Sequence, residues 1–308
     1  MVDTCLILQY HRVGRLCYDP LQWSIEPYKF ESQMEYLRNN CNVISIDEMK
    51  RHIEAKIPFR QRTVIVTFDG GYADVLNTAR AVLERYQIFT TIFSTSANII
   101  TRGQLWWDTL EDYFIANHFR GELEVEIDGR MLEWSLTTQL DKFKAYHDLF
   151  SVLIDKTAQE QQDILNQIIL SIDLQAEELD SHRTMDAREL KKLDESDLIT
   201  IGGHTHNGMR LSSLGQWEQS KEISKNKEVL EEVLDHKIDY FSDPFGCSDG
   251  HDLTGINKIL KDNDFSLACG ETYSMVNLTE NNVLNLPRVK VGNWNQIMFH
   301  TFLERFFE

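Results

Sequence analysis

The stretch TVIVTFDGGYAD, residues 63–74, decides the fold of this 308-residue chain. Its first six residues are apolar or β-branched, which predicts a buried strand that stops at Asp69-Gly70-Gly71. The segment 73–86 then predicts a helix, and TTIFS at 90–94 predicts the next strand. Strand, helix and strand at this spacing indicate a parallel βαβ unit.

The flanking sequence extends the same α/β pattern in both directions. Upstream, CLILQY at 5–10 predicts a buried strand that ends at the polar pair His11-Arg12. Further elements are expected as a helix at 28–39, a strand at 43–46 with a helix start at 46–48, a helix at 187–193, strands at 198–202 and 240–242, a helix at 216–234, and strands near 267–268 and 289–291.

The middle of the chain, about 110–181, has a different character. Asp128-Gly129 lies between two short runs, 123–127 and 131–134, which predicts a hairpin, and long amphipathic segments predict helices after it. We therefore expect one domain over residues 1–308, in which 110–181 is a mainly helical insertion on the α/β core.

Charge and composition exclude several classes of partner. The net charge of −18 would repel nucleic acid and acidic membrane surfaces. No apolar run approaches the roughly 20 residues that span a bilayer, and the N-terminus reads as a strand rather than a signal peptide. The five cysteines are scattered without metal-binding spacing, which predicts reduced thiols in a cytoplasmic protein.

Polar residues follow the predicted strands at Asp69, His204 and Asp243, and His11 follows the first strand. In parallel α/β folds ligands bind outside the carboxyl ends of the strands, so these positions predict one site. Taken alone, Asp69 reads equally well as a helix N-cap beside a glycine turn. His204 and His206 are two residues apart, and in an extended chain they would point to opposite sides.

Three motifs resemble those of the polysaccharide deacetylases, carbohydrate esterase family 4. VTFDGGYAD at 66–74 resembles the family's TFDDGY, IGGHTHNGMRLSSL at 201–214 resembles HTxxH with its leucine-rich turn, and YFSDPFG at 240–246 resembles the third motif. LQYHRV at 8–13, LWWD at 105–108 and LPRV at 286–289 are similar to the sugar-cluster type subgroup. The matches occur in the family's order and span residues 6–294.

The resemblance implies a deformed (β/α) barrel that hydrolyses the acetamide of an N-acylated sugar or oligosaccharide. It implies Asp69 as the base, the Phe245 N–H as the oxyanion donor, and a divalent metal, commonly zinc, with His204 as a ligand. His206, two residues further on, is a separate candidate ligand. The residues expected to contact substrate are His11, Tyr72, Trp107, Asp108, Asp243 and Arg288. Trp107 also reads as core or pocket wall, and Arg288 reads equally as one partner of a structural ion pair.

The departures from the family pattern concern the metal. The second aspartate position holds Gly70, the second ligand histidine position holds Gly208, and the third-motif arginine position holds Ser242. A glycine has no side-chain donor, and a tight zinc site normally needs three protein ligands. Either the metal is lost, or Asp69, His11, His206 and Asp243 replace the missing ligands. Restoring Asp at position 70 and His at position 208 is then expected to raise zinc binding.

The function expected from the sequence is removal of an N-acyl group, such as acetyl, from an amino sugar during polysaccharide or glycolipid assembly. The sugar would be polymeric, nucleotide-linked or lipid-linked. The alternative is a non-catalytic carbohydrate-binding protein on the same fold. Metal-free acyl hydrolysis or transfer is a third interpretation, and Asp69 is the only residue that supports it.

Overall fold

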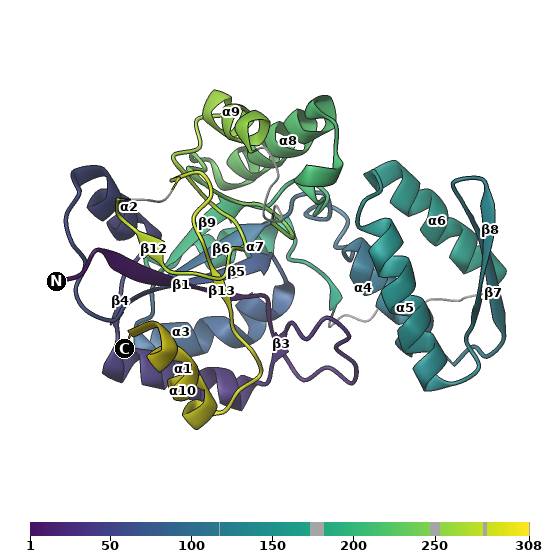
Figure 1. The fold of residues 1–308 in the computed structure, drawn as a ribbon, viewed down its shortest axis with the longest axis horizontal. Helices are drawn as coiled ribbons and strands as arrows, with labels where there is room; N and C mark the ends of the chain where they lie inside the picture. The colour runs from purple at the N-terminus through teal and green to yellow at the C-terminus, as the bar shows by residue number, and fades with distance from the viewer. Residues whose placement is uncertain (117, 173–181, 247–252, 280–281, 308) are drawn as a thin grey trace.

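A curled sheet of mainly parallel strands, open like a half-barrel, forms the centre of the molecule (Figure 1). The computed structural model describes residues 1–116, 118–172, 182–246, 253–279 and 282–307. The strand order is β11-β10-β9-β6-β5-β1-β12, with β13 also beside β1 and β4 beside β5. The strands are β1 (Thr4–Tyr10), β4 (Asn42–Val43), β5 (Thr63–Gly70), β6 (Thr90–Ser94), β9 (Ile199–Gly203), β10 (Tyr240–Ser242), β11 (Leu267–Cys269), β12 (Val276–Asn277) and β13 (Val289–Lys290).

The predicted strand at 63–68 is the middle of this sheet. β5 is buried along its whole length, and it pairs in parallel with β1 on one side and β6 on the other. Such two-sided burial explains the near-continuous apolar sequence. β5 runs two residues further than predicted, so Asp69 is still inside the ladder, opposite Phe93 of β6.

Helices cover the outside of the sheet. They are α1 (Pro27–Asn40), α2 (Ile46–Ala55), α3 (Arg80–Tyr86), α7 (Ala187–Asp194), α8 (Gln216–Leu234), α9 (Thr254–Asp262) and α10 (Gln296–Phe307). The predicted helix at 73–86 begins instead with a π-helical turn, η1 (Val75–Ala79), immediately after the glycine motif. The predicted strand at 43–46 is shorter, because the Ser45 hydroxyl caps α2 by accepting a hydrogen bond from Glu48 N–H.

The segment between β6 and β9 forms a lobe beside the sheet (Figure 1). It contains α4 (Trp106–Glu111), the π-helical turn η2 (Asp112–Ala116), α5 (Gln139–Leu153) and α6 (Ala158–Ser171). The predicted hairpin is present as β7 (Glu122–Ile127) and β8 (Arg130–Ser135), which turn at Asp128-Gly129. Residues 173–181 of the expected insertion lie outside the described residues.

A hydrophobic cluster of its own holds this lobe together. Leu123 of the hairpin, Leu149 of α5 and Ile168 of α6 are fully buried in it. The same cluster includes Trp107 of α4 and Tyr72, which follows the end of β5. The packing of the lobe is therefore continuous with the wall of the strand ends.

Replacing Leu149 by alanine should destabilise the lobe by about 2–5 kcal/mol, because the side chain is fully buried and leaves a cavity. Leu140, 64% exposed on the same helix, is the matched control, and its alanine variant should unfold like the natural protein. Hydrogen exchange of α5 and α6 amides measures the effect. Equal protection in the two variants would contradict the described packing.

Candidate active site at the strand ends

The carboxyl ends of five parallel strands meet around one small cavity. His11 follows β1, Asp69 ends β5 with Gly70, His204 follows β9, Phe245 follows β10, and Glu271 follows β11. The cavity has a volume of about 10 Å³, room for about one water molecule. Its walls are His11, Trp23, Asp69, Gly70, Tyr72, Trp107, His204, Pro244, Phe245 and Glu271.

Asp69 is held by a buried, two-pronged ion pair with Arg288. The Arg288 Nη1 donates to Asp69 Oδ1 at 2.6 Å, and Nη2 donates to Oδ2 at 2.7 Å. The exposed fractions of the two side chains are 1% and 0%. Gln9 Nε2 donates a further hydrogen bond to Asp69 Oδ2 at 2.9 Å. The carboxylate therefore faces the cavity with its position fixed from behind.

This arrangement keeps Asp69 ionised. Burial alone would raise its pKa, but the Arg288 guanidinium, together with His204 and His11, holds the pKa well below the usual range. A carboxylate with so low a pKa is a weak proton acceptor. It is better suited to orient a water molecule and to stabilise a positive charge that forms beside it.

His204 is placed by two hydrogen bonds. Its backbone N–H donates to Asn226 Oδ1 at 3.1 Å, and its Nδ1 lies 3.0 Å from the Ser242 carbonyl oxygen. A carbonyl only accepts, so Nδ1 carries the proton and the lone pair is on Nε2. Burial lowers the pKa of His204, with Asp69 acting in the opposite direction. At neutral pH the ring is therefore an uncharged base.

Aromatic rings form the remaining walls of the cavity. His11 stacks on Trp23 at 4.3 Å with the rings almost parallel, and burial lowers the pKa of His11 to about 3. Trp107 lies 5.6 Å from Trp23 and 5.2 Å from Phe245, edge to face in both pairs. These rings exclude bulk water and offer the flat apolar faces on which sugar rings stack.

The Phe245 backbone has an uncommon conformation, with φ +61°, and Gly246 follows at +57°. A bulky residue rarely adopts this left-handed region. Within the described ranges, no acceptor lies within hydrogen-bond reach of the Phe245 N–H. Glu271, which packs against Gly246, accepts a hydrogen bond from Gln9 Nε2 at 3.0 Å, and burial raises the pKa of its carboxyl group.

The other predicted site residues take supporting places. Asp108 lies behind the cavity wall: it accepts a hydrogen bond from the Tyr72 hydroxyl at 2.8 Å and pairs with Arg12 at 3.2 Å. Burial raises the pKa of Asp108 to about 6, and Arg12 opposes the shift. Trp107 Nε1 donates to the same Tyr72 oxygen at 2.8 Å. Tyr72 and Trp107 thus reach the cavity, whereas Asp108 fixes their orientation.

Besides Asp108, three predicted site residues do not line the cavity. Arg288 stands behind Asp69, and its Nε donates to the Gly270 carbonyl. Asp243 is buried at the end of β10, with its N–H bonded to the Cys269 carbonyl. His206 has Nδ1 2.8 Å from Ser96 Oγ, and its N–H donates to the Glu222 carbonyl. Of the two neighbouring histidines, only His204 reaches the cavity.

Known proteins show the same architecture. Residues 151–261 match the family model of polysaccharide deacetylase. Over these residues the chain is similar to the polysaccharide deacetylases. No curated protein matches its sequence.

Three solved structures of this kind superpose over nearly the whole chain. The Streptococcus pyogenes deacetylase PplD, in complex with acetate, has 13% identity, a TM-score of 0.60 and coverage of 95% of this chain and 94% of its own. IcaB from Ammonifex degensii has 17% identity, a TM-score of 0.60 and coverage of 98% and 96%. The BpsB deacetylase domain from Bordetella bronchiseptica has 12% identity, a TM-score of 0.56 and coverage of 94% and 96%. These likenesses show the fold.

Deacetylases of this family are generally metal-dependent, but the residues present here do not fit that metal. A Cβ at Gly70, where φ is +98°, would stand 2.7 Å from the Tyr72 ring, and a Cβ at Gly208, where φ is +71°, would stand 2.9 Å from the Trp107 ring. The space for both missing ligands is filled by rings. In the described part of the chain, no group of three or more His, Cys, Asp or Glu is placed to hold a metal ion.

Some residues of the site carried no prediction. Glu271 comes two positions after β11, the same strand-end signal that marked Asp69, but that strand is only three residues long. Trp23 lies in an irregular segment without periodicity. Asn226 is fully buried in the middle of α8, and its Nδ2 donates to the Ser94 carbonyl and to the carbonyl of Thr205 in the His204 loop. No local sequence pattern distinguishes this asparagine.

Replacing Asp69 by asparagine should leave Arg288 buried without its counter-charge, which costs about 3–5 kcal/mol at pH 7. The pKa of Asp69 is lower in the folded than in the unfolded protein. The stability that this carboxylate adds is therefore complete above the unfolded-state pKa of about 4, and it is lost as the pH falls through the folded-state pKa. Urea unfolding at pH 7, 4 and 3 should show that the difference in the free energy of unfolding between the natural protein and the variant becomes smaller as the pH falls. The exposed Asp148→Asn variant is the control. A difference in the free energy of unfolding that does not change with pH would contradict an ionised Asp69 paired with Arg288.

The double variant Gly70→Asp, Gly208→His should lose at least about 2 kcal/mol per site and gain no zinc, contrary to the expectation from the sequence. Both positions have positive φ, and both rings are in the way. Gly129→Asp is the control for backbone strain alone, because at φ +73° a Cβ there meets nothing within 4 Å. Urea unfolding and elemental analysis are the measurements. Stoichiometric zinc in a stable double variant would refute the claim that the Tyr72 and Trp107 rings occupy the space of the missing ligands.

Proposed function

We propose that this protein removes an N-acyl group, most simply acetyl, from an amino sugar of a polysaccharide or glycolipid. The observation that carries the proposal is the cavity itself. His204, the ionised Asp69 and Phe245 line this cavity, which has room for about one water, at the strand ends of a deacetylase-like fold. A neutral imidazole and an ionised carboxylate thus line the same cavity.

The roles follow from the geometry. His204 takes a proton from the water through Nε2, and Asp69 stabilises the imidazolium that forms. The water oxygen attacks the acyl carbon, and the Phe245 N–H donates to the oxyanion of the tetrahedral intermediate. Glu271, whose pKa is raised by burial, supplies a proton to the leaving amine. Because its pKa is held low by Arg288, Asp69 acts as an electrostatic partner rather than as the proton acceptor.

The substrate side of the proposal rests on the aromatic wall. His11 with Trp23, Tyr72 and Trp107 offer ring faces and a hydroxyl to a pyranose. Asp243 and Arg288 stay outside direct contact and hold the strand ends. A polymeric, nucleotide-linked or lipid-linked amino sugar each presents the same acetamide, and all three belong to the proposal.

A reducing, cytoplasmic compartment is part of the same proposal. Cys5, Cys17, Cys41 and Cys269 carry free thiols, and Cys247 lies outside the described residues. Within the described ranges no helix is both long and apolar enough to cross a membrane.

Non-catalytic saccharide binding is the second candidate function. The specific observation in its favour is that Tyr72 and Trp107 fill the two positions where family members place metal ligands. The filled positions leave the aromatic wall and the cavity intact, so a sugar could still dock without turnover.

The test is acetate release from N,N′,N″-triacetylchitotriose by protein treated with a chelator. His204→Ala should lower kcat/KM by about 100-fold or more, the contribution of a positioned base. His206→Ala is the matched control and should match the natural protein, because that ring is turned away toward Ser96. Circular dichroism verifies the folding of both variants. Absence of acetate release from the natural protein, with saccharide binding retained, would replace the hydrolase by the binding function.

A further inference from the structure

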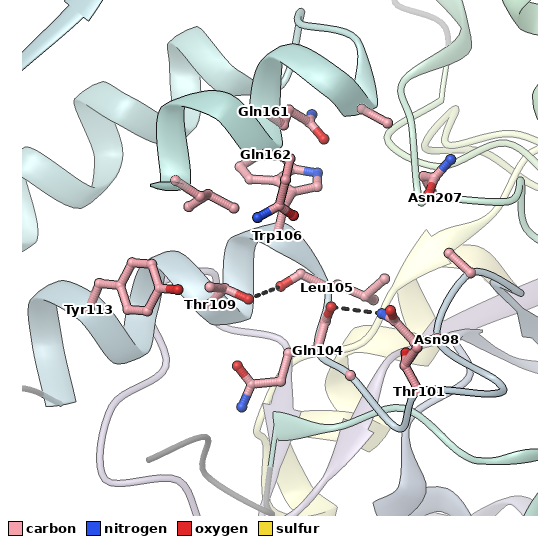
Figure 2. A pocket seen from close by; sticks show the side chains of 14 residues that line it. Asn98, Thr101, Gln104, Leu105, Trp106, Thr109, Tyr113, Gln161, Gln162 and Asn207 are labelled. Atoms are coloured by element: carbon pink, nitrogen blue, oxygen red, sulfur yellow. Dashed lines mark hydrogen bonds between the residues drawn. The ribbon is translucent and has the colours of Figure 1, made fainter. Parts of the chain in front are cut away.

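A second, larger cavity lies between the sheet and the lobe (Figure 2). Its volume is about 340 Å³, within the range of roughly 300–1,000 Å³ that is usual for small-molecule sites. Helix α6 forms one wall, and the segment from Ala97 to Tyr113 forms the opposite wall. Asn207, from the His204 loop, closes one side.

The lining is polar but carries no charged side chain. Five amides line it, Asn98, Gln104, Gln161, Gln162 and Asn207, together with two threonine hydroxyls and two aromatic rings. In a protein with a net charge of −18, such a neutral surface is distinctive. Amides both donate and accept, which suits hydroxyl groups, and they offer nothing to neutralise an anion. The amide nitrogens already donate to protein groups, for example Gln104 Nε2 to Asp112 at 2.9 Å and Asn207 Nδ2 to Glu222 at 2.7 Å, so the lining is held in place before a ligand enters.

Trp106 provides an independent sign of a missing partner. The residue is 7% exposed, and its Nε1 is buried without a hydrogen-bond acceptor among the described residues. Most buried polar groups in native proteins are hydrogen-bonded, and an unpaired donor of this kind costs about 1–3 kcal/mol. A hydroxyl oxygen that enters beside the indole would satisfy it.

The wall opposite α6 is already rigid. Asn98 Nδ2 donates to the Gln104 carbonyl at 2.7 Å, and Thr109 Oγ1 donates to the Leu105 carbonyl at 3.3 Å; both bonds are drawn in Figure 2. On the other side, Gln161 Nε2 donates to the Leu153 carbonyl at 2.8 Å, and Gln162 Nε2 donates to Asn166 Oδ1 at 3.0 Å. A ligand would therefore meet a largely formed site, with little ordering cost.

We infer that this cavity is a saccharide-binding subsite that takes one neutral, polyhydroxylated sugar unit. Consecutive residues connect it to the strand-end cavity: Trp106 lines this cavity and Trp107 the other, with the two indoles edge to face at 5.2 Å. A sugar bound here lies behind the wall of the proposed active site. The inference concerns binding alone and holds whether or not the strand-end cavity hydrolyses its ligand.

The decisive variant blocks the cavity without removing a hydrogen bond. Ala158 is the first residue of α6 and lines the cavity, so Ala158→Phe places a ring inside it. Gln159→Phe adds the same ring one residue further along, at an exposed position outside the lining, and is the matched control. Gln162→Ala removes one amide and should weaken binding about tenfold, the equivalent of one hydrogen-bonded group.

Binding is measured by isothermal titration calorimetry with two neutral probes, N,N′,N″-triacetylchitotriose and cellotriose, and with the cationic chitosan trimer. All titrations use a His204→Ala background, so that turnover does not contribute. We expect binding of both neutral probes, loss in Ala158→Phe and retention in Gln159→Phe. Unchanged binding in Ala158→Phe, or a preference for the charged trimer, overturns the inference. Acetate release from the protein with His204 intact reports separately on the proposed hydrolase.

Discussion

The buried pair of Asp69 and Arg288 is the interaction on which the strand-end cavity depends. Every nitrogen of the Arg288 guanidinium donates: Nε to the Gly270 carbonyl, Nη1 to Asp69 and the Thr67 hydroxyl, and Nη2 to Asp69 and the Ser242 hydroxyl. These acceptors belong to β5, β10 and the residue after β11. One side chain thereby ties three strand ends together. A buried charge pair contributes little net stability, but losing one partner is costly, so the pair fixes geometry more than it adds to folding free energy.

The fold was predictable because its signals are local. The β-branched run before Asp69 can only be a buried strand, and the spacing to the next strand leaves room for one helix. The partner of Asp69 was not predictable. Arg288 is 219 positions away in the sequence, and its approach depends on the register of β13 against β1. The third motif seemed to have lost its arginine at Ser242, yet a guanidinium from another element donates to that very hydroxyl.

At Gly70 and Gly208 the sequence shows what is missing, but it does not show what replaces it. Gly70 and Gly208 have no side-chain donor, but their sequence neighbours do not reveal what occupies the space beside them. The answer requires a positive φ at each glycine and the rings of Tyr72 and Trp107 above them. Asp108 and Arg12 then hold the Tyr72 ring from behind. The change from a ligand to glycine is therefore one part of a repacked wall, in which several residues depend on one another.

The two π-helical turns have a further consequence. η1 and η2 each hold one residue more per turn than an α-helix, and both lie beside residues of the site. One residue corresponds to a rotation of about 100° around a helix axis. Deleting a residue from η1 would therefore turn Asp74 relative to α3 and away from Arg12, its partner at 3.3 Å. Alignments of related chains that place a gap in either turn describe proteins with a differently oriented wall, not merely a shorter helix.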